Sequence, residues 1–116
     1  MPTAREILIV EPEDLVRWSL VTYLAQWFEV HPAGSKAAAD QILEDYPIDA
    51  VVVSDDLSDE AADEIEIHAR SRNPAARVVR MVTHAPADKR LNKGTLRLEK
   101  PFELSRLGGL LGTESA

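Results

Sequence analysis

Acidic and hydroxyl side chains follow two short apolar runs of the sequence, each at the point where the run ends. Glu11 comes directly after residues 7–10 (ILIV), and residues 54–56 (SDD) come directly after residues 50–53 (AVVV). In an open sheet of parallel strands, ligands bind outside the carboxyl ends of the strands. If both runs are strands of such a sheet, these side chains converge at one edge, and we expect the functional site there.

Other residue types that could carry chemistry do not form a recognisable site. Ser54 and His84 could pair as nucleophile and base, but the G-x-S-x-G turn of hydrolases is absent and no orienting acid is evident. His31, His68 and His84 lack metal-ligand spacing, so we expect surface or otherwise satisfied histidines. The absence of cysteine excludes disulfides and thiolate metal sites.

Strands that alternate with helices have to position the groups at the predicted edge. Runs of β-favouring apolar residues predict strands at residues 7–10, 28–31, 50–53, 77–82 and 95–98. Apolar residues at helical spacing predict helices at about 14–26, 36–46, 61–71 and 104–111, with one or two further turns within 86–93. This alternation indicates an α/β fold, with a parallel sheet covered by helices on both faces.

Local signals set the helix boundaries. Asp14 is predicted to cap the first helix and Ser35 the second, which Pro47 stops. Glu13 and Asp14 are explained by the preference of acids for helix N-termini, whereas we place Glu11 in the site. The expected apolar face of the first helix consists of Val16, Leu20, Tyr23, Leu24 and Trp27.

Two residues do not fit their predicted elements. Arg80 lies inside the strand at 77–82, where a charged side chain needs a partner that the sequence does not identify. Trp18 lies opposite the apolar face of the first helix. It is either half-packed under a loop or a contact for a partner.

Composition limits the classes of function. The chain has 116 residues and a formal net charge of −7, which would repel a phosphate backbone and argues against direct binding of nucleic acid. No apolar run approaches the length that spans a membrane, so we expect a soluble, cytoplasmic protein. We predict one domain over residues 1–111, followed by a tail or the start of a linker at 112–116.

The order of four motifs resembles the receiver domain of two-component response regulators, the CheY-like family. The resemblance covers roughly Glu6 to Leu111, and the Lys-Pro peptide of the last motif is its most specific part. Residues 13–20 (EDLVRWSL) most resemble receivers that head NtrC-type transcriptional activators. The four motifs are residues 7–11 (ILIVE), 49–57 (DAVVVSDDL), 78–83 (VVRMVT) and 98–102 (LEKPF).

The resemblance implies a flavodoxin-like (βα)5 fold, doubly wound around a five-stranded parallel sheet. It implies that an aspartate accepts a phosphoryl group from a histidine kinase, with Mg²⁺ held by acids at the ends of the first and third strands. Phosphoryl transfer needs such a nucleophile, a divalent cation and a fixed cation or hydroxyl. The family positions correspond to Glu11 and Pro12 for the first acid pair, Ser54 for the phosphoacceptor, Thr83 for the switch hydroxyl, and Lys100 with Pro101 for the conserved Lys-Pro.

The chain departs from the family at two of these carboxylates. Pro12 removes the direct metal ligand of the first strand, and Ser54 cannot form an acyl phosphate. Glu11 and Asp56 remain as weak candidate metal ligands, so we expect no metal and no other cofactor. We hypothesise that Lys100 reaches Glu11 and the Ser54 region as a built-in counter-ion.

Asp55 leaves a second assignment open, because it stands next to Ser54. Counted without gaps from Ile7, the phosphoacceptor position falls on Ser54. The use of Asp55 would need an inserted residue in the third strand, such as a bulge, which would turn Val51 and Val53 to the opposite faces. In that case Asp55, with Glu11 and Asp56, would form a working phosphoreceiver that needs Mg²⁺.

Two further departures concern the switching machinery of the family. The segment between Thr83 and Lys100 is shorter than usual by about a turn and a half of helix, which predicts a shortened fourth helix. Arg97 occupies the strand position where receivers commonly have an aromatic switch residue. We therefore do not expect conventional switching through Thr83 and an aromatic partner.

These observations predict a pseudo-receiver, a phosphorylation-independent module for protein–protein interaction rather than an enzyme. The expected partners are proteins: a histidine kinase, an output domain or a second copy of the chain, which would give a homodimer. The first alternative is the phosphoreceiver on Asp55. The second is a flavodoxin-like domain that binds a small molecule or nucleotide, against which the absence of a Gly-rich phosphate loop argues.

Overall fold

A single five-stranded parallel sheet, in the order β2-β1-β3-β4-β5, forms the centre of the molecule. The computed structural model describes residues 5–82 and 95–99 and Leu111. The strands are β1 (Glu6–Val10), β2 (Glu29–Ala33), β3 (Ala50–Ser54), β4 (Arg77–Val82) and β5 (Thr95–Glu99). The predicted five-stranded α/β fold is therefore confirmed.

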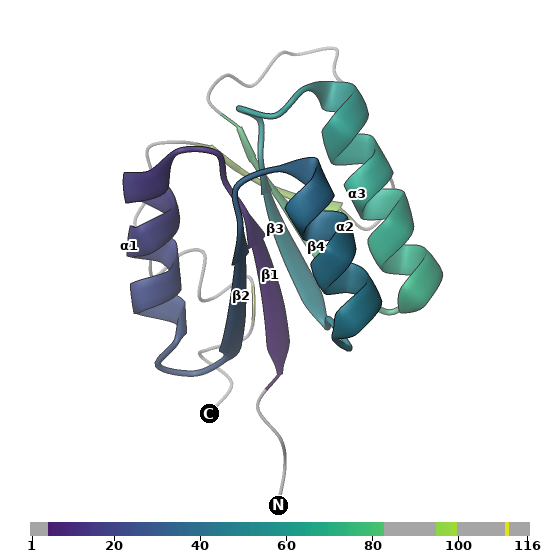
Figure 1. The fold of residues 1–116 in the computed structure, drawn as a ribbon, viewed down its shortest axis with the longest axis horizontal. Coiled ribbons are helices and arrows are strands. Elements are labelled where there is room, and N and C mark those ends of the chain that lie inside the picture. The colour runs from purple at the N-terminus through teal and green to yellow at the C-terminus, as the bar shows by residue number, and fades with distance from the viewer. Residues whose placement is uncertain (1–4, 83–94, 100–110, 112–116) are drawn as a thin grey trace, which may run out of the picture.

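Helices cover both faces of this sheet. α1 (Asp14–Leu24) lies on one face, while α2 (Lys36–Asp45) and α3 (Asp59–Arg72) lie side by side on the other (Figure 1). The chain crosses from β1 to the edge strand β2 and then returns past β1 to β3, so the strand order reverses beside β1. That reversal is the point at which open α/β sheets bind ligands.

The two faces of the sheet have separate hydrophobic cores, and alternate residues of each central strand enter one or the other. Ile9 and Val52 belong to the core under α1, whereas Val10 and Val53 belong to the core under α2 and α3. Strands buried on both faces read as continuous apolar runs, which is why their positions could be predicted. The helical members of the two cores include Leu20 and Leu24 of α1, Ala39 and Leu43 of α2, and Ala62, Ile65 and Ala69 of α3.

The residue predicted to cap α1 is wrong by one position. Glu13 occupies the N-cap position and makes no side-chain capping hydrogen bond, whereas Asp14 is the first helical residue. The Asp14 carboxylate accepts instead from the guanidinium of Arg17, one turn further along the helix. Asp14 therefore contributes as an acid in the first turn of the helix rather than as its cap.

The predicted end of α1 is also too late. The helix ends at Leu24, and residues 25–27 form a turn. Val16 and Tyr23 pack against the core as predicted. Trp27 leaves the helical face and packs edge-on against the Tyr23 ring, with 5.1 Å between the ring centroids.

The other helices begin at serine caps. Ser35 accepts from the Ala38 N–H at the start of α2, as predicted. Ser58 accepts from the Ala61 N–H and starts α3 at Asp59, two residues earlier than predicted. On the inward face of α2, Ala39 and Leu43 are buried, whereas Ala38 and Tyr46 are exposed.

Arg80 finds its partners on α3. Its Nη1 lies 3.0 Å from Oδ1 of Asp63 and 3.4 Å from Oε1 of Glu66. Arg80 and Glu66 are 3% and 1% exposed, so this is a buried ion pair between β4 and α3. The second Glu66 oxygen, Oε2, accepts from Arg70 at 2.5 Å, which completes a charge cluster under α3.

Several predictions fall outside the described residues: the helical turns within 86–93, the shortened fourth helix, the last helix up to residue 110, and the tail at 112–116. None of the helices in the described part of the chain has the length and apolar character to cross a membrane.

Candidate functional site

Glu11 and Ser54 lie next to each other at the carboxyl ends of the two central strands. The register pairs Val10 of β1 with Val53 of β3, and Glu11 and Ser54 are the next residue of each strand line. Both side chains are 0% exposed. By the alternation of the strands they share the face of Ile9 and Val52. The structure therefore brings together the two residues that the sequence places at this edge.

Glu11 is held by the loop that follows it. One carboxylate oxygen, Oε2, accepts from the Glu13 N–H at 3.1 Å. The Glu11 N–H donates to the Ala33 carbonyl of β2 at 3.0 Å, which extends the ladder of β1 and β2 by one residue. The backbone and the carboxylate of Glu11 are thus each held by one hydrogen bond at the β1–α1 junction.

Arg17 braces the same loop from α1. Its Nη1 donates to the Glu11 carbonyl at 2.8 Å and to the Pro12 carbonyl at 3.4 Å. Gly34 leaves room for this guanidinium, because a Cβ at Gly34 would lie 3.0 Å from Nη1. This role could not be predicted, because Arg17 looks like a surface residue until α1 is placed beside the start of α2.

Ser54 ends β3 and starts a tight turn. Its Oγ accepts from the Asp56 N–H at 3.1 Å, and its carbonyl accepts from the Leu57 N–H at 3.4 Å. The Asp55 N–H donates to the Met81 carbonyl of β4 at 2.9 Å. A serine hydroxyl commonly accepts in this way from an N–H two residues on. Asp55 is half-buried and Asp56 is exposed.

The register of β3 advances one residue at a time along both of its neighbours. Ala50 to Val53 pair with Ile7 to Val10 of β1, and Ala50 to Ser54 pair with Arg77 to Met81 of β4. Val51 and Val53 face the core under α2 and α3 together. In this register Ser54 is the last strand residue, and Asp55 follows it in the turn.

Solved structures resemble the chain over almost its whole length. No family model matches the chain, and no curated protein matches it either. A response regulator receiver protein from Sinorhizobium medicae WSM419 is 24% identical, with a TM-score of 0.82 over 95% of this chain and 93% of that one. A CheY-like receiver domain protein from Methanospirillum hungatei JF-1 is 19% identical, with a TM-score of 0.84 over 97% and 94%.

The chain has the fold of a receiver domain. The chemotaxis protein CheY4 of Vibrio cholerae shares this receiver fold at 17% identity, with a TM-score of 0.82 over 96% of this chain and 98% of that one. The receiver fold places the carboxyl ends of β1 and β3 side by side. It is this edge that Glu11 and Ser54 occupy.

The donor set of this receiver edge fits a hard dication poorly. Mg²⁺ is bound through one or two carboxylates with near-octahedral oxygen ligands. The β1 edge offers the Glu11 carboxylate, already engaged by the Glu13 N–H, while Pro12 has no carboxylate to add. Within residues 5–82, no group of three His, Asp or Glu side chains is arranged to hold a metal ion.

The remaining receiver positions cannot be described. Thr83, Lys100 and Pro101 lie outside the described residues, and only the backbone of Arg97 is described, as part of β5. The hypothesis that Lys100 reaches Glu11 therefore stays a prediction.

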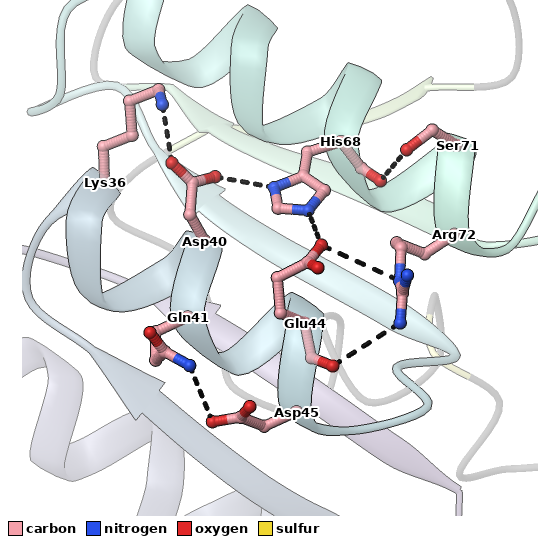
Figure 2. A network of polar contacts seen from close by, with 8 residues as sticks. All are labelled: Lys36, Asp40, Gln41, Glu44, Asp45, His68, Ser71 and Arg72. Carbon is pink, nitrogen blue, oxygen red and sulfur yellow. Dashed lines mark hydrogen bonds and ion pairs between the residues drawn. The ribbon is translucent and has the colours of Figure 1, made fainter.

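A second polar cluster lies away from this edge, between α2 and α3 (Figure 2). His68 of α3 contacts the carboxylates of Asp40 and Glu44 on α2. The positions of the histidines in the sequence did not predict this cluster. The available signal was the spacing of Asp40 and Glu44, which puts two acids on one face of α2.

Proposed function

We propose that the chain is a pseudo-receiver of a two-component signalling pathway, which acts through protein contacts without being phosphorylated. The observation that carries the proposal is Ser54, at the end of β3 beside Glu11. In the resemblance to receivers, this position belongs to the phosphoacceptor aspartate. A serine there cannot form the acyl phosphate, and Pro12 supplies no second carboxylate for Mg²⁺.

The geometry of the turn supports Ser54 rather than Asp55 at the phosphoacceptor position. β3 pairs residue by residue with both neighbours up to its end, as the ungapped alignment to the family requires. Asp55 follows the strand and continues the ladder to β4 through its N–H. A phosphoreceiver on Asp55 is the alternative, and it would need this turn to rearrange.

The proposed partners follow from the same assignment. A receiver that is not an enzyme and lacks phosphoryl chemistry acts by being recognised, so its partners are a histidine kinase, an output domain or a second copy. This function places the protein in the cytoplasm. A small-molecule domain is disfavoured, because no Gly-rich phosphate loop follows β1 or β3.

Mg²⁺ and beryllofluoride, which mimics a bound phosphoryl group, test the proposal by backbone amide chemical shifts. The wild-type protein is expected to show no shifts at Glu11 or at residues 54–57. The Pro12→Asp, Ser54→Asp double variant rebuilds both lost carboxylates, so it is expected to gain Mg²⁺-dependent shifts there. Shifts in the wild type that disappear in Asp55→Asn would overturn the proposal in favour of the phosphoreceiver. A double variant without Mg²⁺-dependent shifts would show that the absence of these two carboxylates does not explain the loss of phosphoryl chemistry.

A further inference from the structure

His68 lies between two carboxylates that belong to the neighbouring helix. Its Nδ1 is 2.8 Å from Oδ1 of Asp40, and its Nε2 is 2.6 Å from Oε2 of Glu44 (Figure 2). Both nitrogens of the His68 ring, which belongs to α3, therefore contact side chains of α2. The side chains of Asp40 and His68 are 29% and 24% exposed, whereas that of Glu44 is 53% exposed.

The hydrogen-bond partners of His68 require a proton on each nitrogen of its ring. An ionised carboxylate only accepts hydrogen bonds, and a neutral imidazole has a single N–H to donate. Both contacts are therefore satisfied only by the imidazolium. The hydrogen bond to Asp40 raises the pKa of His68, partial burial opposes that shift, and the hydrogen bond to Glu44 adds to it.

The other charged groups around His68 balance the two carboxylates. Lys36 Nζ lies 2.6 Å from Asp40 Oδ2 and 3.3 Å from Glu64 Oε2, and Arg72 Nε lies 3.9 Å from Glu44 Oε2. Asp45 faces Gln41, which donates to it at 3.0 Å. With the imidazolium, every carboxylate in this network has a cationic or amide partner.

This geometry does not suit a metal ion. Asp40 and Glu44 lie at different nitrogens of the same ring, so the three side chains cannot direct their donor atoms to one point without rearranging. The cluster is a bridge between helices rather than an ion site.

The rest of α3 is held by a different contact. Arg80 of β4 binds Asp63 and Glu66 in the middle of the helix, five and two residues before His68. Beyond His68, the ends of α2 and α3 line a groove formed by Glu44, Asp45, Tyr46, Pro47, Ser71 and Arg72. His68 is therefore placed to control the C-terminal ends of the two helices while Arg80 keeps α3 on the sheet.

We propose that His68 is a proton-operated clasp that ties the C-terminal half of α3 to α2. When His68 is protonated, the imidazolium binds both carboxylates and holds the C-terminal ends of α2 and α3 together. When the proton leaves, one of the two carboxylates loses its hydrogen bond from His68 and the helix ends separate. This device does not depend on the proposed function of the Ser54 edge.

The sign of the pH dependence follows from the pKa directions. The pKa of His68 is raised in the folded protein, so its contribution is complete below the ordinary value of about 6.5 and is lost as the pH rises through the folded pKa. The hydrogen bond from His68 chiefly lowers the pKa of Glu44. For Asp40, partial burial favours protonation, but the hydrogen bonds from Lys36 and His68 outweigh it and lower the pKa. The carboxylates therefore weaken the clasp only in acid.

Paired titrations of the wild type and His68→Gln test the proposal. The wild type is expected to melt about 4 °C above the variant near pH 6, and the difference is expected to shrink to less than half once His68 has lost its proton. The ring proton signal of His68 should titrate above the ordinary pKa of about 6.5. Amide shifts of residues 44–47 and 71–72 should follow that titration in the wild type and be absent in the variant.

Three results would overturn the clasp. The first is a pair of melting curves that stay parallel at all pH values, and the second is a His68 signal that titrates at or below the ordinary pKa. The third is a His68 titration that leaves the groove amides unmoved, which would leave an ion pair without a conformational role. The same comparison in a His31→Gln background removes the other described histidine, which contacts Glu6 at 3.0 Å, from both arms. The wild-type NMR titration decides the question even if the variant does not fold.

Discussion

At the scale of single residues, we expect the stability of the described part of the chain to depend strongly on the buried charge of Arg80. A charge inside a central strand is tolerated only when its partners are supplied by the element packed on that strand. Glu66 and Asp63 supply them from α3, and Arg70 holds the remaining oxygen of Glu66. The cluster therefore fixes which turn of α3 lies over β4.

Removal of Arg80 alone is expected to be strongly destabilising. Arg80→Ala leaves the Glu66 carboxylate buried with Arg70 as its cation, so the free energy of unfolding should fall by about 3 kcal/mol. Arg80→Met combined with Glu66→Met removes both buried charges, and its stability should lie within about 1 kcal/mol of the wild type. Urea unfolding measures both. A single variant as stable as the wild type would mean that the buried pair is not formed.

The position of Glu11 and Ser54 at one edge of the sheet was predictable, because strand ends are visible in the sequence. Glu11 and Ser54 follow apolar runs, and parallel strands put their carboxyl ends at one edge. The partners of Arg80 and His68 were not predictable. Each depends on how a helix is rotated and placed over its neighbour, and the spacing within one segment does not contain that information.

At the scale of elements, α1 has two contrasting faces. Leu20 and Leu24 are buried in the core, whereas Leu15 and Trp18 are 69% and 64% exposed. Trp18 was predicted to lie off the apolar face, and the structure leaves it open to solvent rather than under a loop. Under the proposed function, this exposed face is available for a protein partner.

The two faces should respond differently to truncation. Leu20→Ala creates a cavity under α1 and is expected to lower the free energy of unfolding by about 3 kcal/mol. Trp18→Ala removes an exposed side chain and should change it by less than about 0.5 kcal/mol. Chemical denaturation of the two variants makes the comparison. Equal losses would mean that Trp18 is packed rather than exposed.

The boundaries of the elements were predicted less well than their existence. Pro32 was expected to close the second strand but lies within β2, which tolerates a proline because β2 is an edge strand. Asp59 and Glu60 looked like loop residues, although Ser58 caps α3 just before them. The proline and the serine cap are both strong local signals, but their effect on the element boundary depends on where the element lies in the fold.

At the scale of the whole molecule, two kinds of polar site lie in different parts of the fold. The Glu11–Ser54 edge lies at the carboxyl ends of β1 and β3, and we propose that it lacks the carboxylates that phosphoryl chemistry needs. The His68 cluster lies between α2 and α3, and it ties two helices together. The α/β fold was predictable from the alternation of apolar runs, because strands buried on both faces have to alternate with helices that cover them.

The central claim, that this receiver fold is not phosphorylated, is tested most directly by intact mass after incubation with Mg²⁺ and acetyl phosphate. We expect the wild-type mass to stay unchanged, because Ser54 cannot form an acyl phosphate and the Glu11 edge does not assemble a Mg²⁺ site. A Mg²⁺-dependent gain of one phosphoryl group would contradict the claim. Its loss in Asp55→Asn would then identify Asp55 as the phosphoacceptor and the chain as a working switch.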